Sequence, residues 1–145
     1  MGEERMLVQL VKPDPILLED PVRPSIWPEE RVSFTRDVWA LIEDKQVAAI
    51  LCVAYKDMIP TTEAELMSRS DAWEGDNAIL YSIWSYRKGA GSTLVREYLE
   101  WVRIPGASIK RVVTMSPKTE MARNFHYKNG ARLLQANEET VNYEY

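Results

Sequence analysis

Short apolar runs alternate with polar or glycine-containing segments along the chain, and the lengths of these runs predict strands. The runs of strand length are Met6–Val11, Asp37–Ile42, Gln46–Tyr55, Ala78–Trp84, Arg111–Met115, Arg132–Gln135 and Thr140–Tyr145. A short polar turn between the second and third runs predicts an antiparallel hairpin, whereas the segment between the fourth and fifth is long enough for a parallel crossover. We therefore expect a mixed, mostly antiparallel α/β (α+β) sheet with a central parallel strand pair and flanking helices.

Three of the intervening segments carry helix signals. The range Thr62–Trp73 begins with a capping box that Glu65 completes. The range Ser116–Lys128 begins with serine as N-cap and proline at the first helical position. Between them lies an amphipathic helix that reaches about Val102, and its apolar stripe consists of Leu94, Val95, Tyr98, Leu99 and Val102.

The composition fits one domain, residues 1–145, with a formal net charge of -4. This mildly acidic charge argues against non-specific nucleic-acid binding, which needs Lys and Arg to neutralise phosphates. Five of the eight prolines fall within Pro13–Pro28, which predicts an extended surface loop with at most a helical turn. The lone cysteine, Cys52, is expected in the core, and no Cys/His cluster predicts a metal site. Because a single cysteine cannot form an internal disulfide, we expect a protein of the reducing cytoplasm. No apolar run is long enough to cross a membrane.

The segment Tyr86–Ser92, between a buried strand and the amphipathic helix, has the chemistry of a phosphate-binding turn. The first amides of a helix are unpaired and carry partial positive charge. Gly89 and Gly91 let an anion approach the backbone, and Arg87 and Lys88 add charge. A Walker loop would place the lysine after the glycines, and a dinucleotide fold would need a third glycine. Coenzyme A (CoA) is the ligand class that fits.

This turn resembles the signature of the GNAT superfamily of N-acetyltransferases, Gln/Arg-x-x-Gly-x-Gly/Ala after the fourth strand. The chain has Tyr86-Arg87-Lys88-Gly89-Ala90-Gly91, with one residue fewer between the arginine and the first glycine. The resemblance implies acetyl-CoA as co-substrate, held by main-chain groups of the fourth strand and by the turn. The residues it implies are Ile83, Trp84, Ser85, Tyr86, Arg87, Lys88, Gly89, Ala90, Gly91, Ser92 and Thr119.

The predicted last helix extends the resemblance. GNAT proteins commonly have Ala-x-x-Phe-Tyr-x-Lys-x-Gly-Phe there, and this chain has Ala122–Ala131 with His126 in place of the tyrosine. That tyrosine often protonates the leaving thiolate of CoA, so the resemblance implies His126 or its neighbour Tyr127 as the acid. Adjacent helical side chains diverge by about 100°, so only one of them can face a thioester. Alternatively, His126 packs or caps the helix without reacting. Thr119 stands where the family often has a CoA-contacting asparagine.

Two departures from the family pattern concern the acceptor side. The segment Lys56–Asp76 replaces the usual tight connection between the third and fourth strands. With Met58, Met67 and Trp73, it is either a substrate-side element or a solvated cover over a sheet edge. The family often uses a carboxylate near the central strands as general base, and the candidates here are Glu43, Asp44, Glu74 and Asp76.

Two functional hypotheses follow. The first is an N-acetyltransferase that moves an acetyl group from acetyl-CoA to a primary amine, whether on a metabolite, an antibiotic-like compound, a peptide N-terminus or a lysine. The alternative is a catalytically attenuated domain that binds CoA or a protein partner without turnover. By analogy with the family, whose final strands often pair across subunits, a homodimer is also an option.

Overall fold

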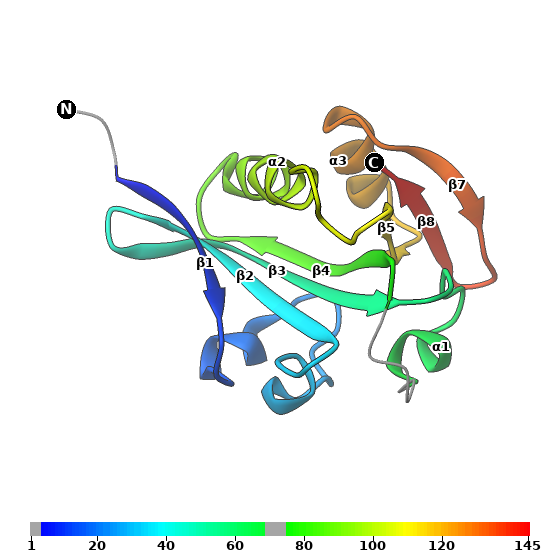
Figure 1. Cartoon of the computed structure of the whole chain (residues 1–145), viewed down its shortest axis with the longest axis horizontal. Coiled ribbons are helices and arrows are strands. Elements are labelled where there is room, and N and C mark those ends of the chain that lie inside the picture. The colour runs from blue at the N-terminus through cyan, green and yellow to red at the C-terminus, as the bar shows by residue number, and fades with distance from the viewer. Residues whose placement is uncertain (1–3, 69–74) are drawn as a thin grey trace.

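The computed structural model describes residues 4–68 and 75–145, and these residues form an eight-stranded sheet (Figure 1). The strand order is β1-β2-β3-β4-β5-β8-β6, and β7 also pairs with β8. The β4–β5 pair is parallel, whereas the other pairs are antiparallel, so the predicted mixed sheet is confirmed. The strands are β1 (Arg5–Leu10), β2 (Arg36–Glu43), β3 (Gln46–Lys56), β4 (Asn77–Ser85), β5 (Arg111–Thr114), β6 (Ser116–Pro117), β7 (Arg132–Ala136) and β8 (Thr140–Glu144).

The predicted hairpin between β2 and β3 is confirmed, and its turn has two residues. Asp44 and Lys45 both have positive φ, 52° and 67°. Two positive φ values are the mark of a type I′ turn, whose twist matches that of the strands it joins. This turn sets the pairing of β2 with β3, the longest strand of the sheet.

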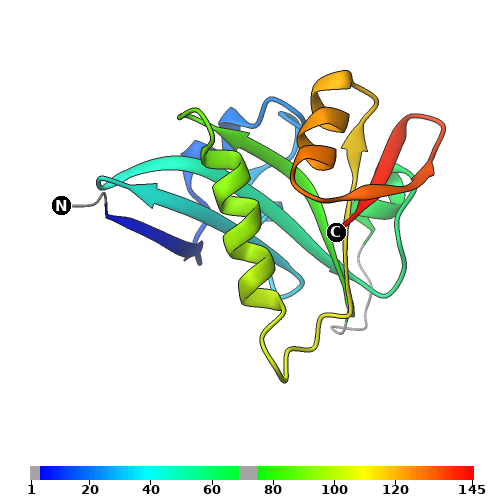
Figure 2. The ribbon, with the colours of Figure 1, turned by 90° about the horizontal axis from the view of Figure 1, so that it is seen from above.

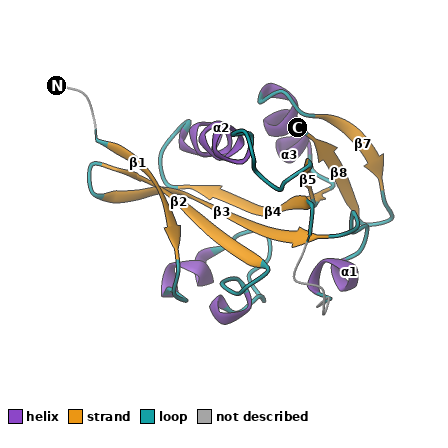
Figure 3. Ribbon diagram, viewed as in Figure 1, coloured by secondary structure: helices purple, strands orange, loops and turns teal. Residues whose placement is uncertain are grey.

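Helices cover both faces of the sheet (Figures 1 and 3). On one side lie α2 (Ala90–Val102) and α3 (Glu120–Lys128), and we call this the α2 face. On the other side, which we call the α1 face, lie α1 (Glu63–Met67) and two short 3-10 turns, η1 (Pro15–Glu19) and η2 (Pro28–Glu30). Among the described residues, no helix is long and apolar enough to cross a membrane.

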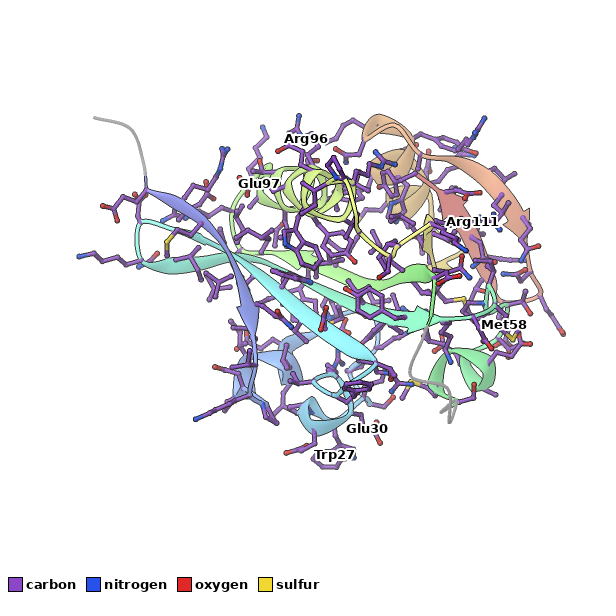
Figure 4. The ribbon with its side chains drawn as sticks, in the orientation of Figure 1. Trp27, Glu30, Met58, Arg96, Glu97 and Arg111 are labelled. Atoms are coloured by element: carbon purple, nitrogen blue, oxygen red, sulfur yellow. The ribbon has the colours of Figure 1, made fainter. Side chains whose placement is uncertain are left out.

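The amphipathic helix α2 buries its apolar stripe as the spacing predicts. All the stripe residues are buried and pack on sheet residues that include Trp39, Leu51 and Leu80. Fully burying one leucine contributes about 1.5–3 kcal/mol, so the stripe as a whole fixes α2 across the strands. Figure 2 shows α2 crossing the sheet from the end of β4, and Figure 4 shows Arg96 on its outer side.

The proline-rich segment packs more closely than the predicted surface loop. It contains η1 and η2, and Leu17 and Ile26 enter the core of the α1 face. Arg31 and Asp20 form an ion pair of 2.6 Å with both side chains fully buried. Leu17, Ile26 and this ion pair give an irregular segment a fixed place on the sheet.

Helix α1 begins as predicted but ends earlier. The Thr62 hydroxyl accepts a hydrogen bond from the Glu65 amide at 3.1 Å, as the N-cap should. The Glu65 carboxylate accepts from the amide of Thr61 rather than from that of Thr62. The helix stops at Met67 because Ser68 is extended. The rest of the predicted helix, including Trp73, lies outside the described residues.

The prediction that Ser116 and Pro117 open the last helix is wrong. These two residues form β6 and pair with Val141 and Thr140 of β8, so backbone partners in the sheet outweigh the local capping signal. The helix begins three residues later, and Thr119 is its N-cap.

Candidate functional site

Strands β4 and β5 are paired only over part of β4. Their register runs from Asn77 with Arg111 to Leu80 with Thr114, and a last backbone bond joins the Met115 amide to the Leu80 carbonyl at 2.9 Å. At Tyr81 a β-bulge shifts the register of β4 against β3, and a bulge bends its strand. Beyond it β4 turns away from β5 (Figure 2). We call this divergence, bounded by Tyr81 and Met115, the fork.

The predicted turn lies at the end of β4, where α2 begins. Gly89 is the N-cap of α2 and has φ +81°, a conformation that favours glycine. In the part of the chain that the structure describes, the amides of Gly91 and Ser92 have no hydrogen-bond partner, whereas that of Ala90 bonds to Arg87. The turn therefore offers two free amides at the positive end of the helix dipole, and we call it the cradle.

Side chains at the cradle differ in where they point. Arg87 Nη1 lies 3.2 Å from Asp44 Oδ2 in the β2–β3 turn, so its guanidinium is held toward that hairpin. Lys88 is exposed. The hydroxyl of Ser92 accepts a hydrogen bond of 3.0 Å from Asn129 Nδ2, which ties the end of α3 to the first turn of α2.

Gly91 is the contact point of β4, α2 and α3. A Cβ at this position would lie 3.4 Å from the ring of Phe125 and 3.9 Å from a methyl carbon of Ile83. The cradle and the unpaired half of β4 are therefore adjacent, with Ile83 between them on the α2 face. This juxtaposition depends on a residue without a side chain.

The side chains of Trp84, Tyr86 and Thr119, also predicted cofactor residues, have partners of their own. Trp84 packs in the core of the α1 face, and its Nε1 donates to the Tyr86 hydroxyl at 2.9 Å. Tyr86 in turn donates to Glu19 at 2.5 Å. The Thr119 hydroxyl caps α3 by accepting from the Ala122 amide at 3.2 Å. The backbone of Trp84 and Ser85 remains on the unpaired half of β4.

His126 lies in an aromatic cluster at the end of α3. Its side chain is 5% exposed and stacks on Tyr143 at 5.3 Å between ring centroids. Its Nδ1 is 2.6 Å from the hydroxyl of Tyr145, a partner that sequence reasoning missed because it is distant in the chain. Burial lowers the pKa of His126 to about 4, so the ring is neutral at pH 7. Burial also raises the pKa of Tyr145.

Tyr127 diverges from His126, as adjacent helical residues must. It is 45% exposed and meets Tyr143 edge-on, with ring centroids 5.5 Å apart. The two predicted acid candidates therefore occupy different environments, one enclosed and one facing solvent.

The predicted base candidates are distributed over the edges of the sheet. Asp44 belongs to the β2–β3 turn, and Glu43 is the last residue of β2. Asp76 precedes β4 and pairs with Lys110 at 3.2 Å. Glu74 lies outside the described residues. At the fork itself the structure places a residue that no local pattern marked: Arg23, from the proline-rich segment.

The described part of the insertion between β3 and β4 that leads into α1 lies on the α1 face. Met67 packs against the core there, and Met58 is 48% exposed near α1 (Figure 4). Hydrogen bonds join the insertion to β8, because Thr140 donates to the Thr61 carbonyl and Asn142 to the Pro60 carbonyl.

Solved structures with this architecture share its fold over nearly the whole chain. A protein from Desulfovibrio desulfuricans, described as an acetyltransferase of the GNAT family, matches with a TM-score of 0.60 and 17% identity over 98% of both chains. The chain has a GNAT-like fold. A Bacillus subtilis acetyltransferase in complex with CoA matches this fold with a TM-score of 0.69 and 10% identity over 97% of both chains.

The same GNAT-like fold occurs within larger proteins. Malonyl-CoA decarboxylase from Rhodopseudomonas palustris matches with a TM-score of 0.72 and 15% identity, over 97% of this chain but only 59% of the enzyme. The Agrobacterium vitis decarboxylase matches with a TM-score of 0.65 and 21% identity, over 82% of this chain and 35% of that one. No protein-family model and no curated protein matches the sequence. Because all identities are low, these likenesses show the fold alone.

Proposed function

We propose that this protein transfers an acyl group, acetyl in the simplest case, from acyl-CoA to a primary amine. The observation that carries the proposal is the adjacency of the cradle and the fork through Gly91. CoA has an anionic pyrophosphate next to a long, amide-containing pantetheine arm. The two free helix amides can bind the pyrophosphate. The main-chain groups on the unpaired edge of β4 can form hydrogen bonds with the amides of the pantetheine arm. Solved neighbours in complex with CoA support this interpretation.

The transfer joins the amine nitrogen to the acyl carbon and breaks the thioester C–S bond. The ammonium substrate loses one proton before attack and a second as the amide forms. One of these two protons ends on the departing thiolate and the other in solvent. Holding both reactants at the fork supplies proximity, and main-chain N–H groups of Tyr81–Ser85 can polarise the thioester carbonyl. None of the described base candidates is held at the fork. We therefore propose that water accepts the first proton, or that the amine reaches the fork already neutral.

We assign the stabilisation of the departing thiolate to His126 and Tyr145. Because His126 is neutral at pH 7, it acts through an N–H group rather than as an imidazolium. When the Tyr145 hydroxyl donates to Nδ1, the hydrogen of the ring resides on Nε2. That N–H is then a hydrogen-bond donor for the leaving thiolate, and Tyr145 fixes its tautomer.

The alternative function, CoA binding without turnover, is favoured by one observation. The guanidinium of Arg23 bonds to both sides of the fork, Nη1 to the Tyr81 carbonyl and Nη2 to the Met115 carbonyl. An acceptor that approaches from the α1 face meets this group first. In both functions we take the chain as one CoA-binding domain over residues 1–145.

Thermal unfolding with and without acetyl-CoA and free CoA tests the shared part of both functions. A ligand at about a hundred times its Kd stabilises a protein by about 2.7 kcal/mol, which gives a clear rise in Tm. Thiol release with a panel of primary amines then separates transfer from binding alone. A chain whose Tm does not respond to millimolar acetyl-CoA or CoA would contradict both.

The variant Gly91→Val tests where CoA binds. Valine adds methyl groups against Phe125 and Ile83, so we expect loss of both the Tm shift and thiol release. The control is Glu100→Val, which introduces the same side chain at an exposed site on the same helix. Retained CoA binding in Gly91→Val would show that the cradle is misassigned.

A further inference from the structure

Arg23 lies where the next backbone hydrogen bond between β4 and the end of β5 would be expected. Backbone pairing between these segments stops at the bond from the Met115 amide to the Leu80 carbonyl. One step further, Arg23 Nη1 donates to the carbonyl of Tyr81, the bulge residue, and Nη2 donates to the carbonyl of Met115 at 3.0 Å. A guanidinium is rigid and planar, so it sets the separation of the two strands that it joins.

Glu63 holds the adjacent edge of the same guanidinium, which shares Nη2 with the edge that faces the strands. Its carboxylate accepts from Nε at 3.0 Å and from Nη2 at 2.8 Å. The Arg23 side chain is 7% exposed, whereas that of Glu63 is 50% exposed at the start of α1. A guanidinium donates two parallel hydrogen bonds to a carboxylate along one edge. The Glu63 carboxylate therefore fixes how the Arg23 guanidinium is oriented toward the strands.

The backbone of Arg23 is fixed as well. Its amide donates to Asp20 Oδ1 at 3.0 Å, and its carbonyl accepts from Arg31 Nη2 at 2.7 Å. Asp20 and Arg31 form the fully buried ion pair of the proline-rich segment. Hydrogen bonds therefore fix both the backbone and the guanidinium of Arg23. The proline-rich segment places this guanidinium between β4 and Met115.

We propose that Arg23 is a positioning residue for acyl transfer, and that Glu63 orients it. This inference rests on the proposed function. Arg23 holds β4 and Met115 at the separation that the acyl end of the donor requires, while the cradle binds the pyrophosphate independently. Errors of about 1 Å in the placement of a reacting group can lower rates a hundredfold. The separation that Arg23 sets between β4 and Met115 therefore affects the rate of acyl transfer. The paired charges leave the fork without net charge, which suits an uncharged acyl group.

Two ligands separate this role from a purely structural one. Acetyl-CoA reaches both the cradle and the fork, whereas 3′-phospho-ADP, which is CoA without its pantetheine arm, reaches the cradle alone. In Arg23→Gln we expect the Kd for acetyl-CoA to rise about tenfold while the Kd for 3′-phospho-ADP stays within about twofold. Calorimetric titration well below the Tm of each variant measures both constants.

The matched control is Arg36→Gln. Arg36 is also a buried arginine that donates to backbone carbonyls, those of Glu30, Leu66 and Met67, but it ties η2 and α1 rather than the fork. We expect this variant to lose stability and to keep the wild-type ratio of the two Kd values. Arg23→Lys, which keeps the charge and loses the planar donors, should raise the acetyl-CoA Kd by a smaller factor, and it serves as the test if Arg23→Gln does not fold.

The outcomes are distinct. A wild-type ratio in both Arg23 variants, or an equal change of that ratio in Arg36→Gln, would overturn the role of Arg23 and leave the proposed function intact. A wild-type protein that binds neither ligand would overturn the proposed function and this inference with it. A selective loss of acetyl-CoA affinity, graded from Arg23→Lys to Arg23→Gln, would support both.

Discussion

On the α2 face of the sheet a regular helix buries a continuous apolar stripe, whereas on the α1 face an irregular segment is held by buried charges. The stripe of α2 contacts Leu51 and Leu80 through dispersion and the hydrophobic effect, which need no particular geometry. The α1 face depends on the Asp20–Arg31 pair and on Arg23, whose bonds are directional. One face therefore tolerates conservative substitutions, and the other does not.

The largest effect should come from breaking the buried pair of the α1 face. Asp20→Ala leaves the Arg31 guanidinium fully buried without its carboxylate, which should cost about 3–5 kcal/mol of unfolding free energy. Urea denaturation measures the loss. The control is Lys110→Ala, which removes an exposed ion pair with Asp76 and should cost at most about 1 kcal/mol. Equal losses in the two variants would contradict the contrast between the faces.

The corresponding test of the α2 face is Leu94→Ala. Leu94 is fully buried in the stripe, so truncation should cost about 2–5 kcal/mol through lost transfer energy and a residual cavity. Leu94→Met, which conserves volume, should cost less than about 1.5 kcal/mol. By contrast, Asp20→Asn should recover little of the Asp20→Ala loss, since an amide lacks the charge that Arg31 requires. A Leu94→Met loss as large as that of Leu94→Ala would remove the distinction.

The two faces should also respond to pH in different windows. Burial lowers the pKa of His126 to about 4, against about 6.5 for an exposed histidine. Between these values the unfolded chain binds a proton that the folded protein does not. The free energy of unfolding should therefore fall by up to about 3 kcal/mol as the pH drops from 6.5 toward 4. His126 is the only histidine in the sequence, so His126→Gln should flatten this slope.

Asp20 on the α1 face should act only at lower pH. Burial alone would raise the pKa of Asp20, but hydrogen bonds from Arg31 and from the amides of Arg23 and Val22 outweigh it and hold that pKa below its usual 3.8. A carboxylate with a depressed pKa contributes stability above its unfolded pKa and loses it as the pH falls further. Chemical denaturation at several pH values measures both windows. A His126→Gln variant with the wild-type slope above pH 4 would contradict the assignment.

Sequence patterns predicted the α2 face well and the α1 face poorly, for the same physical reason. Apolar periodicity identifies α2 because each stripe residue repeats the signal of its neighbours. The cradle is equally local, since Gly89 and Gly91 lie within a few residues of each other. Arg23 has no such local signal, because its partners Tyr81 and Met115 are distant in the chain.

The wrong helix start at Ser116 and the unforeseen partner of His126 have the same origin. Ser116 has a strong capping signal, yet β8 supplies it with a strand partner from far along the chain. His126 was identified by its place in a motif, but its partner Tyr145 comes from the final residue. Local rules therefore located the candidate residues, and only tertiary structure defined their partners and protonation.

The smallest effect concerns the turn from which α2 begins. Gly89 and Gly106 have similar positive φ values, 81° and 89°, and a Cβ at either would meet no atom within 4 Å. Replacing each by alanine should therefore cost the same, about 1–2 kcal/mol of backbone strain. Only Gly89 belongs to the cradle, so backbone strain at this position would displace the free amides of Gly91 and Ser92. Gly89→Ala should thus weaken acetyl-CoA binding while Gly106→Ala leaves it unchanged, as calorimetric titration would show. Equal affinities in two variants of equal stability would place the pyrophosphate away from this turn.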